Sequence, residues 1–199
     1  MKKTNLNAGK IARIGVLGAL SAILYMFPEI PVIPPIYKLD FSTMPALLAG
    51  FSMGPIAAVL VTLIKDITGL LHSSSMGVGE LADFIMSGSF AVVATLLYAK
   101  GRSIKSAVWG MAAGTAAMAL AAAAANFWIM IPFYSGAMGM PVDTIVGMIA
   151  KTVPAVDSLG KMILLAVVPF NLLKGVVLSV VGGVIYRYVK PLLTERKAR

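Results

Sequence analysis

Two polar side chains that could bind a ligand lie inside the last long apolar stretch, residues 162–186. This stretch contains one carboxamide, Asn171, and one charge, Lys174. The two are three residues apart, so on a helix they share one face. A lysine near the centre of a membrane helix costs about 2.5–3.5 kcal/mol on insertion scales, so a partner must offset it. We expect both side chains to line a binding site. An ion pair between Lys174 and a neighbouring helix is the alternative.

A third such side chain, Asn126, stands near the outer end of the apolar stretch 107–131. At 1.5 Å per residue, Asn126 lies roughly 7–8 Å below that end, Asn171 nearly as deep, and Lys174 about one turn deeper. Carboxamides offer donors and an acceptor, whereas lysine offers donors only. This set suits a neutral, flat heterocycle with imide-like edges. Stacking surfaces could come from nearby aromatic residues, namely Phe127, Trp128, Phe133, Tyr134 and Phe170.

Four further charges stand in apolar surroundings. Glu80 and Asp83 are three apart at the start of a helix, where carboxylates favour the helix dipole. They could serve capping alone, or one of them could lie at the rim of a ligand cavity. Lys65 and Asp66 are adjacent and point in different directions on a helix. They could pair structurally or face a water-filled cavity, and the sequence leaves both possibilities open.

Several kinds of chemistry have no support. The chain lacks cysteine and has one histidine, His72, so it offers no thiolate or histidine cluster for a metal. Residues 50–54 spell G-x-S-x-G, but in an apolar helix end and without a histidine partner on the same side. Gly160-Lys161 lacks the rest of a phosphate loop. We therefore expect that this chain is not an enzyme, that it has no cofactor, and that it does not itself hydrolyse ATP.

Composition indicates a polytopic α-helical membrane protein with one membrane domain, residues 1–199. Hydrophobic residues make up 59% of the 199, and the mean hydropathy is +0.90. The net charge of +9 does not indicate nucleic-acid binding, because 12 of the 17 Lys and Arg residues form three patches that flank apolar stretches. Such flanks mark the cytoplasmic side of a membrane. The patches are Lys2, Lys3, Lys10 and Arg13; Lys100, Arg102 and Lys105; and Arg187, Lys190, Arg196, Lys197 and Arg199.

The elements that must position the polar residues are six predicted transmembrane helices, at residues 11–27, 40–53, 56–71, 79–98, 107–131 and 162–186. The first is a retained helix, because no signal-peptide cleavage site follows it. Six spans place both termini and loop 100–105 inside, with a pocket that opens outward. The proline-rich residues 28–38 form a stiff external loop, either a lid or a plain connector. Residues 142–153 favour a short interfacial helix.

The first helix carries two overlapping pairs of small residues. Gly15 and Ala19 form one pair, and Gly18 and Ala22 form the other. Small residues at this spacing let another helix approach closely. The approaching helix could belong to this chain or to another protein.

Together these stretches resemble the substrate-binding (S) components of energy-coupling factor (ECF) vitamin transporters, and most closely the riboflavin-specific members. The resemblance covers nearly the whole chain, and its most specific parts are residues 126–134 and 169–175. It also includes residues 38–51, Gly54-Pro55 and residues 79–84.

The resemblance implies a six-helix bundle that binds riboflavin, with Asn126, Asn171 and Lys174 at the isoalloxazine ring and loop 28–38 as the lid. It places further site residues at Leu39, Asp40, Phe41, Gly79, Glu80, Asp83, Phe127, Tyr134 and Phe170. Asp83 stands where the family is expected to have asparagine, so its role is open.

The resemblance also implies partners and a location. Gly15, Gly18, Ala19 and Ala22 would face a transmembrane coupling subunit, which works with two ATPases in the plasma membrane of a prokaryote. The loaded subunit would topple in the membrane to release the vitamin inside. A carrier of folate, thiamine or biotin, an intramembrane enzyme and a structural membrane protein are the alternatives. In the riboflavin reading, a ligand carbonyl relieves Lys174 when the site is loaded, and water or Asn171 does so when it is empty.

Overall fold

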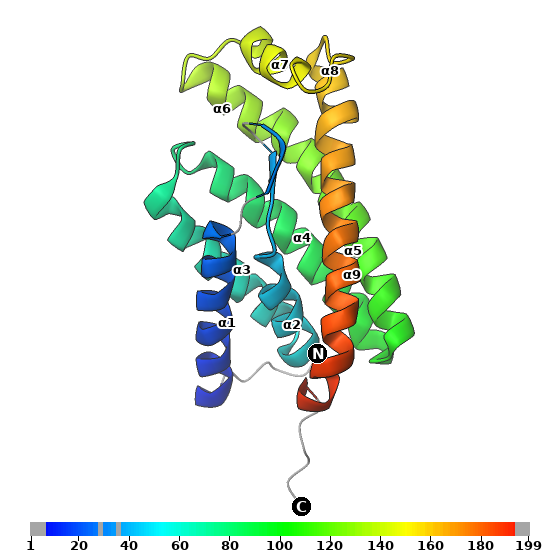
Figure 1. Cartoon of the computed structure of the whole chain (residues 1–199). Coiled ribbons are helices and arrows are strands. Elements are labelled where there is room, and N and C mark those ends of the chain that lie inside the picture. Colours follow the sequence, from blue (N-terminus) through cyan, green and yellow to red (C-terminus); the bar gives the residue numbers. More distant parts are fainter. Residues whose placement is uncertain (1–6, 28–29, 35–36, 194–199) are drawn as a thin grey trace, which may run out of the picture.

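The computed structural model describes residues 7–27, 30–34 and 37–193, which form a helical bundle with one short hairpin (Figure 1). The positions of Lys2, Lys3, Pro28, Pro35, Arg196, Lys197 and Arg199 lie outside the described residues. The helices are α1 (Ala8–Met26), α2 (Thr43–Met53), α3 (Pro55–Gly69), α4 (Val78–Gly101), α5 (Ile104–Ala125), α6 (Ile131–Gly136), α7 (Val142–Ala150), α8 (Leu159–Met162) and α9 (Val168–Leu193).

Short irregular elements connect these helices. A 3₁₀ turn, η1 (Leu70–His72), follows α3. Two π-helical segments, η2 (Asn126–Met130) and η3 (Ile163–Val167), join α5 to α6 and α8 to α9. The predicted fifth helix, 107–131, therefore continues into α6, and the predicted sixth helix, 162–186, begins earlier, in α8. Each of the two contains a π segment.

Helix starts follow local capping chemistry. Asn7 accepts a hydrogen bond from the Lys10 backbone N–H at 2.9 Å, so α1 begins at Ala8 rather than at residue 11. The second helix begins at Thr43 rather than at residue 40. Asp40 Oδ1 accepts the Ser42 backbone N–H at 2.8 Å, which holds residues 40–42 in a turn before the helix.

Five helical stretches in the described part of the chain are long and apolar enough to cross a membrane. They are Ala8–Met26, Pro55–His72, Val78–Gly101, Ile104–Gly136 and Leu159–Tyr186. The expected second span contains only the 11 residues of α2, about 16 Å of helix, which falls short of a hydrocarbon core of about 30 Å. The six-span count therefore depends on how the hairpin and α2 are grouped.

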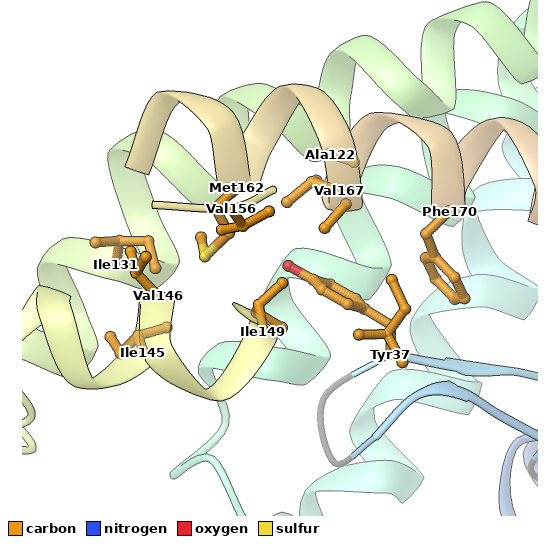
Figure 2. Packing of buried hydrophobic residues seen from close by; sticks show 12 residues of the cluster. Tyr37, Ala122, Ile131, Ile145, Val146, Ile149, Val156, Met162, Val167 and Phe170 are labelled. Atoms are coloured by element: carbon orange, nitrogen blue, oxygen red, sulfur yellow. The ribbon is translucent and has the colours of Figure 1, made fainter. Parts of the chain in front are cut away.

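The proline-rich segment contains an antiparallel hairpin of β1 (Ile30–Ile33) and β2 (Tyr37–Leu39). The hairpin lies lengthwise between helices and leads directly into α2, so the two elements together run along the bundle (Figure 1). Ile33 and Tyr37 are buried in a cluster with α7 and the α8–α9 region (Figure 2). This packing goes beyond a plain surface connector.

Small residues allow close helix packing in the bundle. A Cβ at Gly110 of α5 would lie 2.5 Å from the Ala94 carbonyl oxygen of α4, so the helices touch through backbone there. The prediction that the alanine-rich helix packs closely against neighbours is confirmed.

The two ends of the bundle differ. The α2–α3 turn, the α4–α5 turn and the end of α9 lie at one end, and α6 and α7 lie at the other (Figure 1). Phe51, Tyr98 and Tyr186 pack together at the first end, with the two tyrosine hydroxyls 2.9 Å apart.

Candidate ligand-binding site

A cavity of about 680 Å³ opens between the hairpin and the helix ends beside it. This volume lies within the range of about 300–1,000 Å³ that is usual for small-molecule sites. Of the residues that the sequence assigned to a site, Asp40, Gly79, Glu80, Asp83, Asn126, Tyr134, Phe170, Asn171 and Lys174 line it.

Lys174 is 5% exposed and lies between two carboxylates. Its Nζ donates to Asp40 Oδ2 at 2.9 Å and to Asp83 Oδ1 at 3.3 Å. The direct partners of the buried charge are therefore two carboxylates rather than Asn171, and the ion-pair alternative holds. Asp40 directly follows β2, and Asp83 lies on α4. Both are far from Lys174 along the chain, so the sequence around Lys174 could not identify them as its partners.

The charges continue behind the cavity wall. Lys65, which is fully buried, donates to Asp83 and, at 2.5 Å, to Asp66 Oδ1. Its Nζ also lies 4.6 Å from the centre of the Tyr25 ring. The two residues whose role the sequence left open thus belong to a buried network that includes Asp40, Asp83 and Lys174. Its three carboxylates and two ammonium groups alternate in sign along the contacts.

Hydroxyl groups hold the network carboxylates in place. The Ser42 side chain donates to Asp40 Oδ1, and Ser87 donates to Asp83 Oδ2 at 3.1 Å. The Ser42 backbone carbonyl in turn accepts a hydrogen bond from Ser21 of α1 at 2.5 Å. Buried charges need such additional partners, because ion pairing alone rarely offsets their desolvation.

Asn126 and Asn171 are oriented in the same way. Each Nδ2 donates at 2.9 Å to the backbone carbonyl four residues earlier, Ala122 for the first and Val167 for the second. Asn126 begins one π segment and Val167 ends the other. π-Helical turns are frequent at functional sites. The bonds orient each carboxamide and leave its second N–H donor and at least one lone pair of its Oδ1 available to a ligand edge.

Tyr37 of β2 joins the hairpin to this pair of helices. Its hydroxyl donates to Asn126 Oδ1 at 3.3 Å, and its ring centre lies 5.2 Å from that of Phe170. In Figure 2 the Tyr37 ring projects from the hairpin into the cluster, with Phe170 on one side and Ile149 on the other. Burial raises the pKa of Tyr37 well above its usual value, so the hydroxyl remains a donor at neutral pH.

Glu80 belongs to a separate polar group at the start of α4. It is 7% exposed and accepts hydrogen bonds from Ser73 at 2.8 Å and from Ser75 at 3.2 Å. Beside it Gly69 leaves room for the Tyr25 ring, since a Cβ there would lie 2.8 Å from Tyr25 Cε1. Glu80 therefore does more than cap the helix, because it lines the cavity.

Three predicted site residues, together with the stacking candidates Trp128 and Phe133, do not line the cavity. Leu39 is buried on β2, and Phe41 packs against the core cluster that contains Met44 and Phe90. Phe127 is 50% exposed on the outside of η2. Residues 126 and 127 point apart because neighbouring positions on a helix differ by about 100°.

The four small residues of α1 separate into two faces. Gly18 and Ala22 are buried, and a Cβ on Gly18 would lie 2.8 Å from Ile64 of α3. Gly15 and Ala19 are exposed, and a Cβ on Gly15 would meet nothing within 4 Å. Gly18 and Ala22 therefore pack inside the chain, which corrects their assignment to an intermolecular surface.

The sequence did not point to several cavity residues. Tyr25 lies in the last turn of α1, and Tyr37 stands directly before the matched stretch that starts at Lys38. Only proximity to those stretches could have suggested them. Methionine, with its flexible and polarisable side chain, recurs along the wall. These methionines are Met26, Met86, Met130, Met138, Met140 and Met148.

Comparisons with known proteins agree with this architecture. A model of the family described as "ECF transporter, substrate-specific component" matches residues 9–186. The chain is 33% identical over 189 residues to the riboflavin transporter RibU of Staphylococcus aureus (strain TCH60), which covers 94% of this chain and 93% of that protein. It is 29% identical over 198 residues to the riboflavin transporter FmnP of Bacillus subtilis (strain 168), which covers 95% and 97%.

Among solved structures, the chain is similar to the S component of a bacterial ECF transporter. The TM-score is 0.73 and the sequence identity is 31%, over 94% of this chain and 98% of the other.

Proposed function

Because this chain belongs to the family of substrate-specific components of ECF transporters, we propose that it captures riboflavin for an ATP-driven importer. The cavity is large enough for a flavin and lies in a multi-pass membrane protein. The relatives that are named riboflavin transporters support this substrate.

The observation that carries the proposal is the pair of oriented carboxamides, Asn126 and Asn171, beside the aromatic side chains of Tyr37 and Phe170. The flavin ring has a flat apolar body and one edge with alternating carbonyl and N–H groups. The carboxamides offer acceptors and donors to that edge, and the aromatic rings offer apolar surface. Lys174, as a donor, faces the same cavity and can turn toward a ligand carbonyl while it keeps a carboxylate partner.

Riboflavin titration tests the substrate. Flavin fluorescence should fall as riboflavin binds to the detergent-purified protein, and binding should saturate at one equivalent. Unaltered emission at micromolar riboflavin would overturn the assignment. Parallel titrations with folate, thiamine and biotin test the other vitamins that this architecture could carry.

The partner proposal rests on the outward face of α1. Gly15 and Ala19 leave a shallow strip that is flanked by exposed apolar side chains, including Val16 and Ile23. Such a strip suits close approach by a helix of another membrane protein. We assign it to the transmembrane coupling subunit of an ECF module, and ATP hydrolysis to two separate ATPases.

The charge distribution supports one orientation. Among the described residues, Lys10 and Arg13 lie in the first turns of α1, and Lys100, Arg102 and Lys105 lie around the α4–α5 turn. The start of α1 and the α4–α5 turn lie at the same end of the bundle (Figure 1). Positive residues beside spans favour the cytoplasm. The cavity and hairpin then open to the outside, and both termini are cytoplasmic.

A further inference from the structure

The cavity has two chemically different ends. One end combines the carboxamides of Asn126 and Asn171 with the rings of Tyr37 and Phe170. The other combines hydroxyl groups with a carboxylate, at Ser75 and Glu80, beside Tyr25 and Gly69. A ligand with a flat ring and a polyhydroxyl tail matches both ends when the ring meets the carboxamides. The tail then reaches the Glu80 end.

Glu80 carries an unneutralised charge at that end. It is nine-tenths buried, and it accepts hydrogen bonds from the hydroxyls of Ser73 and Ser75. Within the described residues no lysine or arginine lies at ion-pair distance from it, whereas Asp40 and Asp83 each contact Lys174. The carboxylate at the tail end is thus the one whose negative charge lacks a direct counter-ion.

The helix start beside Glu80 is also occupied. The backbone N–H groups of Gly77 and Gly79 donate at 2.9 Å to the side chains of Ser73 and Ser75. The same two hydroxyls donate onward to Glu80. Backbone N–H groups at a helix N-terminus can bind an anion. Here two of these N–H groups already donate to the serine hydroxyls, and the hydroxyls donate to the Glu80 carboxylate.

We propose that Glu80 is a specificity-determining residue that disfavours flavins with a phosphorylated tail, so that the site selects free riboflavin over riboflavin 5′-phosphate. This inference rests on the proposed function. A carboxylate can accept hydrogen bonds from tail hydroxyls, and it repels a phosphate of about −1.5 to −2 charge at pH 7. Such selection works by an unfavourable contact with the wrong ligand rather than by extra contacts with the right one.

The test compares dissociation constants for the two flavins in the purified full-length protein. Glu80→Gln keeps an oxygen that accepts from Ser73 and Ser75 and removes the charge. The ratio of riboflavin affinity to phosphate affinity should fall by at least about tenfold in this variant. Asp143→Asn removes an exposed charge on α7 at a position that does not line the cavity, and should leave the ratio unchanged.

A second measurement on the unmodified protein separates charge from size. A neutral 5′-ester of riboflavin, similar in bulk to the phosphate, should bind at least about tenfold more tightly than the phosphate. This comparison also decides the matter if Glu80→Gln does not fold.

Each outcome has a distinct meaning. An unchanged ratio in Glu80→Gln, equal binding of both flavins by the wild type, or equal binding of ester and phosphate would overturn the inference. Tighter binding of riboflavin 5′-phosphate than of riboflavin would also overturn the inference, and would indicate that Lys38, which also lines the cavity, attracts the phosphate. Absence of riboflavin binding by the wild type would instead overturn the proposed function.

Discussion

Lys174 of α9 and Asp40, which directly follows β2, form an ion pair with 2.9 Å between Nζ and Oδ2. The pair joins two parts of the chain that are 134 residues apart. It connects the hairpin and α2 to the helix that carries Asn171. The ion pair that stabilises the buried Lys174 charge therefore also holds together one side of the cavity.

Removal of the Lys174 charge should destabilise the protein. Lys174→Met leaves Asp40 without a cation and Asp83 with Lys65 only. A buried pair that loses one partner costs about 3–5 kcal/mol. Thermal unfolding in detergent should show a lower midpoint. The double variant Lys174→Met with Asp40→Asn should recover part of the loss, and equal stability of the single variant and the wild type would contradict the network.

The carboxamides should determine affinity rather than stability. Asn171→Leu removes the acceptor and donor offered to the ligand, so riboflavin affinity should fall about 10- to 100-fold in fluorescence titration. Leu172→Ala on the exposed side of the same helix is the matched control. An affinity loss of equal size in the control would show that the effect is general to the helix.

Tyr37 should contribute through its ring more than through its hydroxyl. Tyr37→Phe frees Asn126 Oδ1 and keeps the contact with Phe170, so riboflavin affinity should stay within about threefold of wild type. Tyr37→Ala loses aromatic packing worth about 0.5–1.5 kcal/mol in addition to buried apolar area, so its affinity should fall by about tenfold or more. The hairpin has no role in binding if both variants match wild type.

The two faces of α1 should respond differently to bulk. Gly15→Leu points outward, so riboflavin binding and thermal stability should persist while cellular uptake is lost. Gly18→Leu clashes with Ile64, so stability itself should fall by about 1–3 kcal/mol. Uptake that persists in Gly15→Leu would remove this face from the coupling interface.

The orientation can be measured by labelling, because the chain contains no cysteine. Ser103→Cys lies in the α4–α5 turn and Thr144→Cys lies on α7, and both positions are exposed. A membrane-impermeant maleimide should label the Thr144→Cys variant in intact cells. It should label the Ser103→Cys variant only after the cells are lysed. The reverse pattern would invert the proposed topology.

The sequence by itself determined the class of the protein and most of its helical elements. Long apolar runs must be helical in a membrane because lipid cannot satisfy backbone polar groups. The same logic marked Asn126, Asn171 and Lys174, since polar groups in such runs are costly and need a purpose. These three residues do line one cavity.

Tertiary structure alone decided the partners. Periodicity shows which residues share a face of one helix, but it does not show which distant side chain lies opposite. The sequence therefore could not show that Lys174 pairs with Asp40 and Asp83 rather than with Asn171, or that Lys65 belongs to the same network. Ion pairs across a bundle depend on how helices from separate parts of the chain pack, and neither spacing nor propensity along one helix contains that information.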